Sequence, residues 1–128
     1  MAGFSDYLEL EVLDHVFGGA SFTAPATIYV ALYTVAPDDT GGGTEVSGGG
    51  YVRQSMAFGT AASGSISNSG SVEFPTATAD YGTVVAMGLF DASSAGNLLA
   101  YGDLTTSKTV SNGDVFRFNA SSVTISLD

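Results

Sequence analysis

The sequence predicts a mainly β protein, an antiparallel β-sandwich of about eight short strands, jelly-roll or immunoglobulin-like, with one amphipathic helix at the N-terminus. Downstream of Gly19, short runs rich in Val, Ile, Thr, Tyr and Phe alternate with clusters of Gly, Ser, Asn and Asp. Turn signals recur about every 8 to 15 residues, and no helices alternate with the strands as a parallel sheet would require. The 128 residues are expected to form a single domain.

The helix is predicted over residues 4–18, because Ser5 suits its N-cap and the pair Gly18 and Gly19 suits its exit. One broad side of the helical wheel is apolar, and Glu11, Asp14 and His15 lie opposite. The apolar residues are Leu8, Leu10, Val12, Leu13, Val16 and Phe17. We expect this helix to lie over one sheet of the sandwich.

The sandwich is predicted over residues 20–128. Its strands are expected near residues 27–34, 51–58, 65–67, 72–74, 83–91, 97–104, 114–119 and 122–127. The runs TIYVALYT (27–34) and VVAMGLF (84–90) are apolar on both faces, so each needs cover on its second face. In the last strand, Val123, Ile125 and Leu127 are expected to point inward.

The chain is strongly acidic, with a formal net charge of −10 and only three cations, Arg53, Lys108 and Arg117. Nucleic-acid binding needs a concentrated positive field, so we expect no nucleic-acid partner. The same charge disfavours anionic membranes and favours a basic partner. The N-terminal segment has no signal-peptide pattern, and no run reaches the ~18 apolar residues of a membrane span. We expect synthesis in the host cytoplasm.

The segment GGGTEVSGGGY (41–51) contains two triple-glycine runs. A nucleotide-binding loop would need Lys followed by Ser or Thr where Gly49 and Gly50 stand, and a helix after it. The residues that follow are strand-like instead. We therefore predict a flexible surface loop over residues 38–50 with an exposed glutamate.

No catalytic arrangement is recognisable in the sequence, so we predict that the protein is not an enzyme and binds no cofactor. His15 is the single histidine, and its neighbour Asp14 projects about 100° away around a helix, which is unsuitable for a catalytic pair. There is no cysteine and no tryptophan. Asp38 and Asp39 lack the alternating spacing of a calcium loop, so we predict no metal site and keep calcium only as a weaker alternative.

Several segments, in order, resemble a family of small virion proteins of tailed bacteriophages, often labelled tail-fibre proteins. The resemblance covers nearly the whole chain. It rests on LDHVFGG (13–19), PATIYVALYT (25–34), SGGGYVR (47–53), FPTAT (74–78), YGTV (81–84), GLFDA (88–92) and GNLLAYGDLTTSK (96–108). It implies a structural component of the phage particle with no catalytic residues.

Within that class, the chain has no long repetitive shaft, which favours a compact module that binds the outer face of the capsid as a decoration or cement protein. The alternative is a tail-fibre or baseplate component involved in host adsorption. The expected partners are the major capsid protein or neighbouring virion proteins, with a homo-oligomer on the particle. The candidate contact residues are Phe4, Tyr7, Leu8, Tyr51, Tyr81 and Tyr101, although core packing is the commoner role for the last three.

Overall fold

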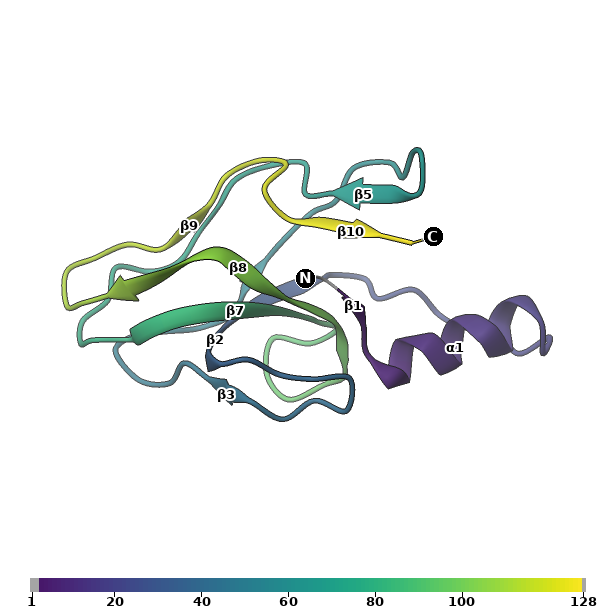
Figure 1. The fold of residues 1–128 in the computed structure, drawn as a ribbon, viewed down its shortest axis with the longest axis horizontal. Helices are drawn as coiled ribbons and strands as arrows, with labels where there is room; N and C mark the ends of the chain where they lie inside the picture. Colours follow the sequence, from purple (N-terminus) through teal and green to yellow (C-terminus); the bar gives the residue numbers. More distant parts are fainter. Residues whose placement is uncertain (1–2, 128) are drawn as a thin grey trace.

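A computed structural model describes residues 3–127 of the chain, which form ten strands and one helix (Figure 1). The elements in chain order are β1 (Gly3–Phe4), α1 (Asp6–Val16), β2 (Tyr29–Val35), β3 (Thr44–Glu45), β4 (Gln54–Ser55), β5 (Ser65–Ser67), β6 (Val72–Glu73), β7 (Gly82–Phe90), β8 (Leu98–Val110), β9 (Arg117–Phe118) and β10 (Thr124–Ser126). The predicted class is confirmed, since the fold is mainly β and antiparallel with a helix near the N-terminus.

The largest sheet has the strand order β1-β8-β7-β2-β3, and β4 also pairs with β2. All of these pairings are antiparallel. The two longest strands, β7 and β8, lie side by side and form the centre of the sheet with β2. Gly88 pairs with Ala31 on one side and with Tyr101 on the other.

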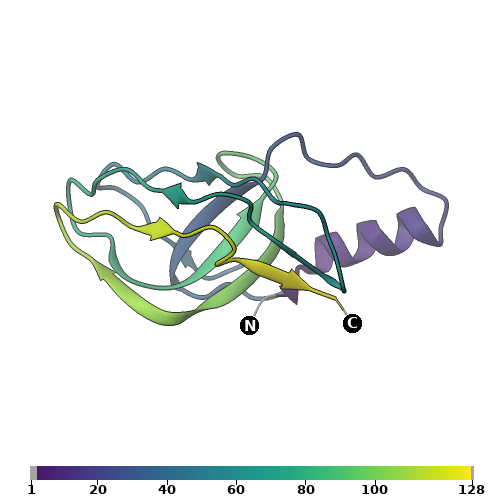
Figure 2. The ribbon, with the colours of Figure 1, turned by 90° about the horizontal axis from the view of Figure 1, so that it is seen from above.

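Two short ribbons, β5 with β10 and β6 with β9, form a second layer opposite the large sheet (Figure 2). The core between the layers is apolar and aromatic. Phe74 is fully buried in it, and the rings of Phe116 and Phe118 pack edge-on against Phe74. Burial of large side chains of this kind supplies most of the driving force for folding.

A buried asparagine joins the ends of the second layer. The side-chain amide of Asn68 donates to the carbonyl oxygens of Gly70 (2.8 Å) and Asn119 (3.0 Å), and its oxygen accepts from the amide of Val123 (2.9 Å). These bonds satisfy the buried amide and fix the chain where it leaves β5 and enters β10.

Several predicted strand bounds differ from the structure. The strand at 65–67 is confirmed, but 51–58 shortens to β4, because only Gln54 and Ser55 pair with β2. In contrast, β8 runs on to Val110, well past the predicted end at 104, since Thr109 and Lys108 pair with β7. Leu127 is exposed, contrary to the prediction, because it lies beyond the end of β10.

The helix is shorter than predicted and does not cover a sheet. Ser5 is its N-cap and Gly19 has a positive φ of 74°, as expected, but Phe4 belongs to β1 and pairs with Ala100. None of the α1 residues is buried. Figures 1 and 2 show α1 extending beyond the end of the β body.

The second face of the large sheet is covered by its own side chains. Tyr33, Phe90 and Leu98 form a second buried cluster with Ala31 and Ala86. A Cβ at Gly88 would lie 2.9 Å from the Tyr33 ring and 3.0 Å from Leu98, so the large side chains fold down over the glycine. Because these side chains bury one another, the second face of the sheet needs no helix to cover it.

Candidate interaction surface at the helix end

Four of the six predicted contact residues lie at one end of the molecule, where α1 leaves the β body. Phe4 is in β1, Tyr7 and Leu8 are in the first turn of α1, and Tyr101 is in β8 opposite Gly3. All four are half-buried. The structure therefore places these four residues at the same end of the molecule.

Ser5 fixes the direction in which the helix leaves the body. Its hydroxyl accepts from the amide of Leu8 (3.2 Å) and donates to the carbonyl oxygen of Leu98, and its own amide donates to Leu99 (2.8 Å). The next amide, of Asp6, donates to the carbonyl oxygen of Asp39 (2.9 Å). One capping residue thus satisfies the start of the helix and attaches it to β8.

On one side of this junction lies an apolar cavity of about 430 Å³. Its walls come from β1, the first turn of α1, the segment before β2 and the β5–β10 ribbon. They include Phe4, Leu8, Ile28, Phe58, Ile66 and Ile125. No charged residue lines it.

On the other side lies a mixed polar and aromatic pocket of about 580 Å³. Tyr7 and Phe90 line it together with Asp39 and Asn97. The hydroxyl of Tyr101 donates to the Asp39 carboxylate. That hydrogen bond and partial desolvation raise the pKa of Tyr101 to about 12, so the phenol is neutral at physiological pH.

Tyr51 and Tyr81 are not on this surface. The ring of Tyr51 stacks on Phe74 at a centroid distance of 5.9 Å, and Tyr81 meets it edge-on at 5.8 Å. Tyr81 is buried, and its hydroxyl donates to the carbonyl oxygen of Pro75 (3.1 Å). Both tyrosines are therefore part of the core cluster, and their position at strand edges next to glycine does not expose them.

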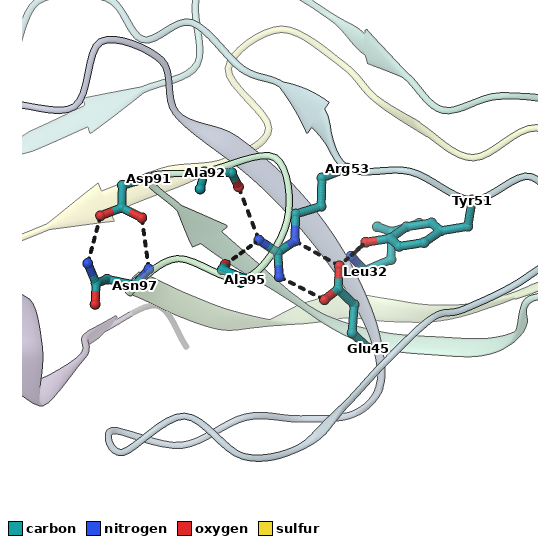
Figure 3. Close-up of polar contacts among 8 residues, drawn as sticks. All are labelled: Leu32, Glu45, Tyr51, Arg53, Asp91, Ala92, Ala95 and Asn97. Atoms are coloured by element: carbon teal, nitrogen blue, oxygen red, sulfur yellow. Dashed lines mark hydrogen bonds and ion pairs between the residues drawn. The ribbon is translucent and has the colours of Figure 1, made fainter.

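Sequence reasoning missed a polar network centred on Arg53 (Figure 3). Its guanidinium donates to both carboxylate oxygens of Glu45, each at 2.9 Å, and to the carbonyl oxygens of Ala92 (3.0 Å) and Ala95 (2.8 Å). The hydroxyl of Tyr51 donates to the same Glu45 (2.7 Å) and accepts from the amide of Leu32 (3.0 Å). Opposite charges eight positions apart in a chain with so few cations were the signal that could have indicated this pair.

This network changes the interpretation of the glycine-rich segment. Glu45 is half-buried and paired, contrary to the prediction of an exposed glutamate, and Val46 is buried. A Cβ at Gly43 would lie 2.5 Å from the carbonyl oxygen of Val35, and one at Gly49 would lie 2.8 Å from that of Ala79. Glycine at these two positions permits close approach of backbones. The flexibility expected for residues 38–50 stays a prediction.

The groups that sequence analysis considered for catalysis or metal binding have structural partners. The amide of Phe22 donates to Nδ1 of His15 (3.3 Å), which ties the end of α1 to the following loop. The carboxylate of Asp38 accepts from the amide (2.9 Å) and hydroxyl (2.7 Å) of Thr40 within a turn. Within residues 3–127, no three His, Asp or Glu side chains are grouped closely enough to hold a metal ion. No helix in that part of the chain is long and apolar enough to cross a membrane.

Residues 3–126 match the family model described as "Podophage GP4 fiber I protein gp80". The chain belongs to this phage fibre family. No curated protein matches the sequence. Because the family match covers nearly the whole chain, it includes both the β body and α1.

Membership of the fibre family confirms the resemblance to virion proteins of tailed phages. The protein is a virion structural protein and is virion-associated. The family description names a fibre, so it favours the tail-fibre alternative over the capsid decoration protein that sequence analysis preferred.

Proposed function

We propose that this protein is a component of a phage fibre and takes part in adsorption to the host. The observation that carries this proposal is the match of residues 3–126 to the fibre family. Capsid decoration has less support, because it rested on the absence of a repetitive shaft. A compact module of this kind is equally suited to the base or the tip of a fibre assembled from several proteins.

Adsorption requires a surface that can hold a host molecule, and the polar pocket beside α1 is the best candidate. It combines the half-buried ring of Tyr7 with hydrogen-bonding groups from Asp39 and Asn97. Sugars are commonly bound by this combination, since the apolar ring face packs on an aromatic group while hydroxyls bond to amides and carboxylates. We propose a host surface glycan as the ligand class.

The proposed role involves no catalysis. The carboxylates near turns are engaged by local donors: Asp91 accepts from Asn97 (2.8 Å), Asp80 from the amide of Asn112 (2.8 Å), and Asp114 from the amide of Ser111 (2.9 Å). These bonds account for the acidic residues as turn-forming groups. The protein would thus act by position and binding within the particle.

Immunogold labelling of intact virions tests the location. We expect gold at the fibres of the tail, whereas an even distribution over the head would support a decoration protein instead. Preincubating host cells with purified protein tests adsorption, and we expect fewer phage particles to adsorb. Tyr7→Ala should lose this competition while Val115→Ser, an exposed change elsewhere on the body, should keep it.

A further inference from the structure

The outer side of α1 carries an uncovered apolar stripe. Leu10, Leu13, Val16 and Phe17 are 61%, 53%, 61% and 81% exposed. By contrast, Phe74, Phe116 and Phe118 of the body are buried. An exposed cluster of large apolar side chains on one helix is typical of a surface that meets a partner.

The part of the chain that the structure describes leaves this stripe uncovered. The half-buried residues of α1 are Tyr7, Leu8, Glu11 and Val12, which lie on the other side of the helix. The helix is attached through its first turn, and its C-terminal half projects away from the sandwich (Figure 2). No residue in the range 3–127 covers Leu13 and Phe17, which leaves them available to a partner.

The spacing of the stripe suits a helix that lies in a groove. Leu10, Leu13 and Phe17 are three and four residues apart, so they form one line along the helix, as the a and d positions of a heptad do. Recognition of this kind uses a few anchor side chains at i, i+3 and i+7, inserted into an apolar groove.

The charges beside the stripe indicate which kind of partner provides that groove. With Leu10 at a and Leu13 at d, Asp14 borders the stripe at e and Glu9 at the g position of the preceding heptad. Asp6 lies in the first turn. Neither Lys nor Arg occurs in α1. Two copies of α1 placed together would bring carboxylates against carboxylates, which is destabilising. The apolar cavity of a second copy offers no cation either.

From this we infer that the outer stripe of α1 docks into an apolar groove bordered by Lys or Arg side chains on a different virion protein. The inference rests on the proposed function, because it describes how a fibre component is held on the particle. The apolar anchors supply affinity, and the acidic border selects a basic partner and disfavours the pairing of two α1 helices.

Photocrosslinking in intact particles tests the partner directly. A benzophenone amino acid replaces Phe17, and adducts are identified by mass spectrometry. We expect an adduct to another virion protein at an apolar segment flanked by Lys or Arg. An adduct to a second copy of this chain, or particles that contain the protein without any adduct, would overturn the inference.

A binding measurement with purified protein separates this inference from the proposed function. The probe is a synthetic helical peptide with Leu at its a and d positions and Lys at e and g, and the matched control has Glu at e and g. We expect binding to the lysine peptide that weakens with salt, and at least tenfold weaker binding to the glutamate peptide. Equal binding of the two peptides, or no binding of either, would contradict the docking chemistry even if immunogold labelling places the protein in a fibre.

Variants complete the test. Phe17→Ser combined with Leu13→Ser should reduce peptide binding at least tenfold and remove the protein from particles, without lowering its melting temperature, because both residues are exposed. Val115→Ser, an exposed apolar change outside the helix, should leave both unchanged. Salt-insensitive self-association in sedimentation that Phe17→Ser abolishes would instead assign the stripe to a second copy.

Discussion

Arg53 and Glu45 face each other through two hydrogen bonds of 2.9 Å, and the guanidinium of Arg53 lies 3.6 Å from the centroid of the Phe90 ring. Their side chains are 8% and 27% exposed. One of the three cations of the chain is thus used inside the protein, where it joins the glycine-rich segment to the turn after β7. It contributes nothing to a positive surface.

Replacing Arg53 should destabilise the fold markedly. In Arg53→Ala the partly buried Glu45 loses its charge partner, and two carbonyl oxygens lose their donor. We expect a loss of about 3 kcal/mol in the free energy of unfolding, measured by chemical denaturation.

The matched control is Arg117→Ala. Arg117 lies 3.9 Å from Glu73, and both side chains are more than half exposed, so its loss should change stability by less than about 0.5 kcal/mol. Equal effects of the two substitutions would show that the Arg53 network does not stabilise the body.

Asn68→Asp should be destabilising in a pH-dependent way. The new carboxylate would face the carbonyl oxygens of Gly70 and Asn119, to which the native amide donates. Ionisation there would be strongly unfavourable, so the loss relative to wild type should be larger at pH 7 than at pH 4. Denaturation at both pH values checks this, and a loss independent of pH would contradict it.

Gly42 and Gly43 allow a matched test of order in the glycine-rich segment, because both have φ of 70°. A Cβ at Gly42 meets nothing within 4 Å, whereas one at Gly43 would lie 2.5 Å from the carbonyl oxygen of Val35. Gly42→Ala should cost about 1 kcal/mol from backbone strain alone. Gly43→Ala should cost clearly more in thermal denaturation. Equal costs would support the flexible loop predicted from the sequence.

Alkaline pH should weaken the fold in a defined window. Burial and the nearby Glu45 carboxylate raise the pKa of Tyr33 from 10.0 to about 12. The hydrogen bond to Asp39 gives Tyr101 a similar pKa of about 12. Since these phenols ionise more readily in the unfolded chain, their contribution to stability is fully present below pH ~10 and is lost as pH rises toward ~12.

The free energy of unfolding measured from pH 9 to 12 checks this, together with phenolate absorbance. Tyr33→Phe should flatten the decline because it removes one ionisable group. Ionisation of all six tyrosines near pH 10 in the folded protein would contradict the expectation.

The β class and the central strands were predictable because burial leaves a direct mark on sequence. The runs that became β2 and β7 are apolar at consecutive positions, as expected for strands covered on both faces. What covers the second face was not predictable. Tyr33 lies over Gly88, and the two residues are brought together only by strand pairing.

The helix itself was predictable from its cap and its glycine exit, but its surroundings were not. Leu10 and Phe17 were interpreted as core-facing because apolar residues on a helix usually face the protein that carries them. A helical wheel identifies the apolar side of a helix but does not show which molecule packs against it. Here Tyr7, Leu8, Glu11 and Val12 are half-buried, and the apolar residues on the other side of the helix are exposed.

Tyr51 and Tyr81 show a similar limit of sequence interpretation. Gly82, the next residue in the sequence, suggested that Tyr81 lies at an open strand edge. In the structure another glycine, Gly49, lies against the Tyr81 ring, since a Cβ there would be 3.2 Å from it. The backbone at Gly49 therefore covers the Tyr81 ring. Contacts between segments some thirty residues apart depend on the fold, so sequence alone did not decide between strand-edge contact and core packing for Tyr51 and Tyr81; in the structure both pack with the core cluster.

The turn between β8 and β9 lies at the end of the body opposite α1 (Figure 1). Its tip has exposed residues, and a side chain at Gly113 would meet nothing within 4 Å. A foreign peptide spliced in at that tip would point away from whatever holds the helix. The protein therefore has a geometry suited to peptide display, with the binding helix at one end and an insertion site at the other.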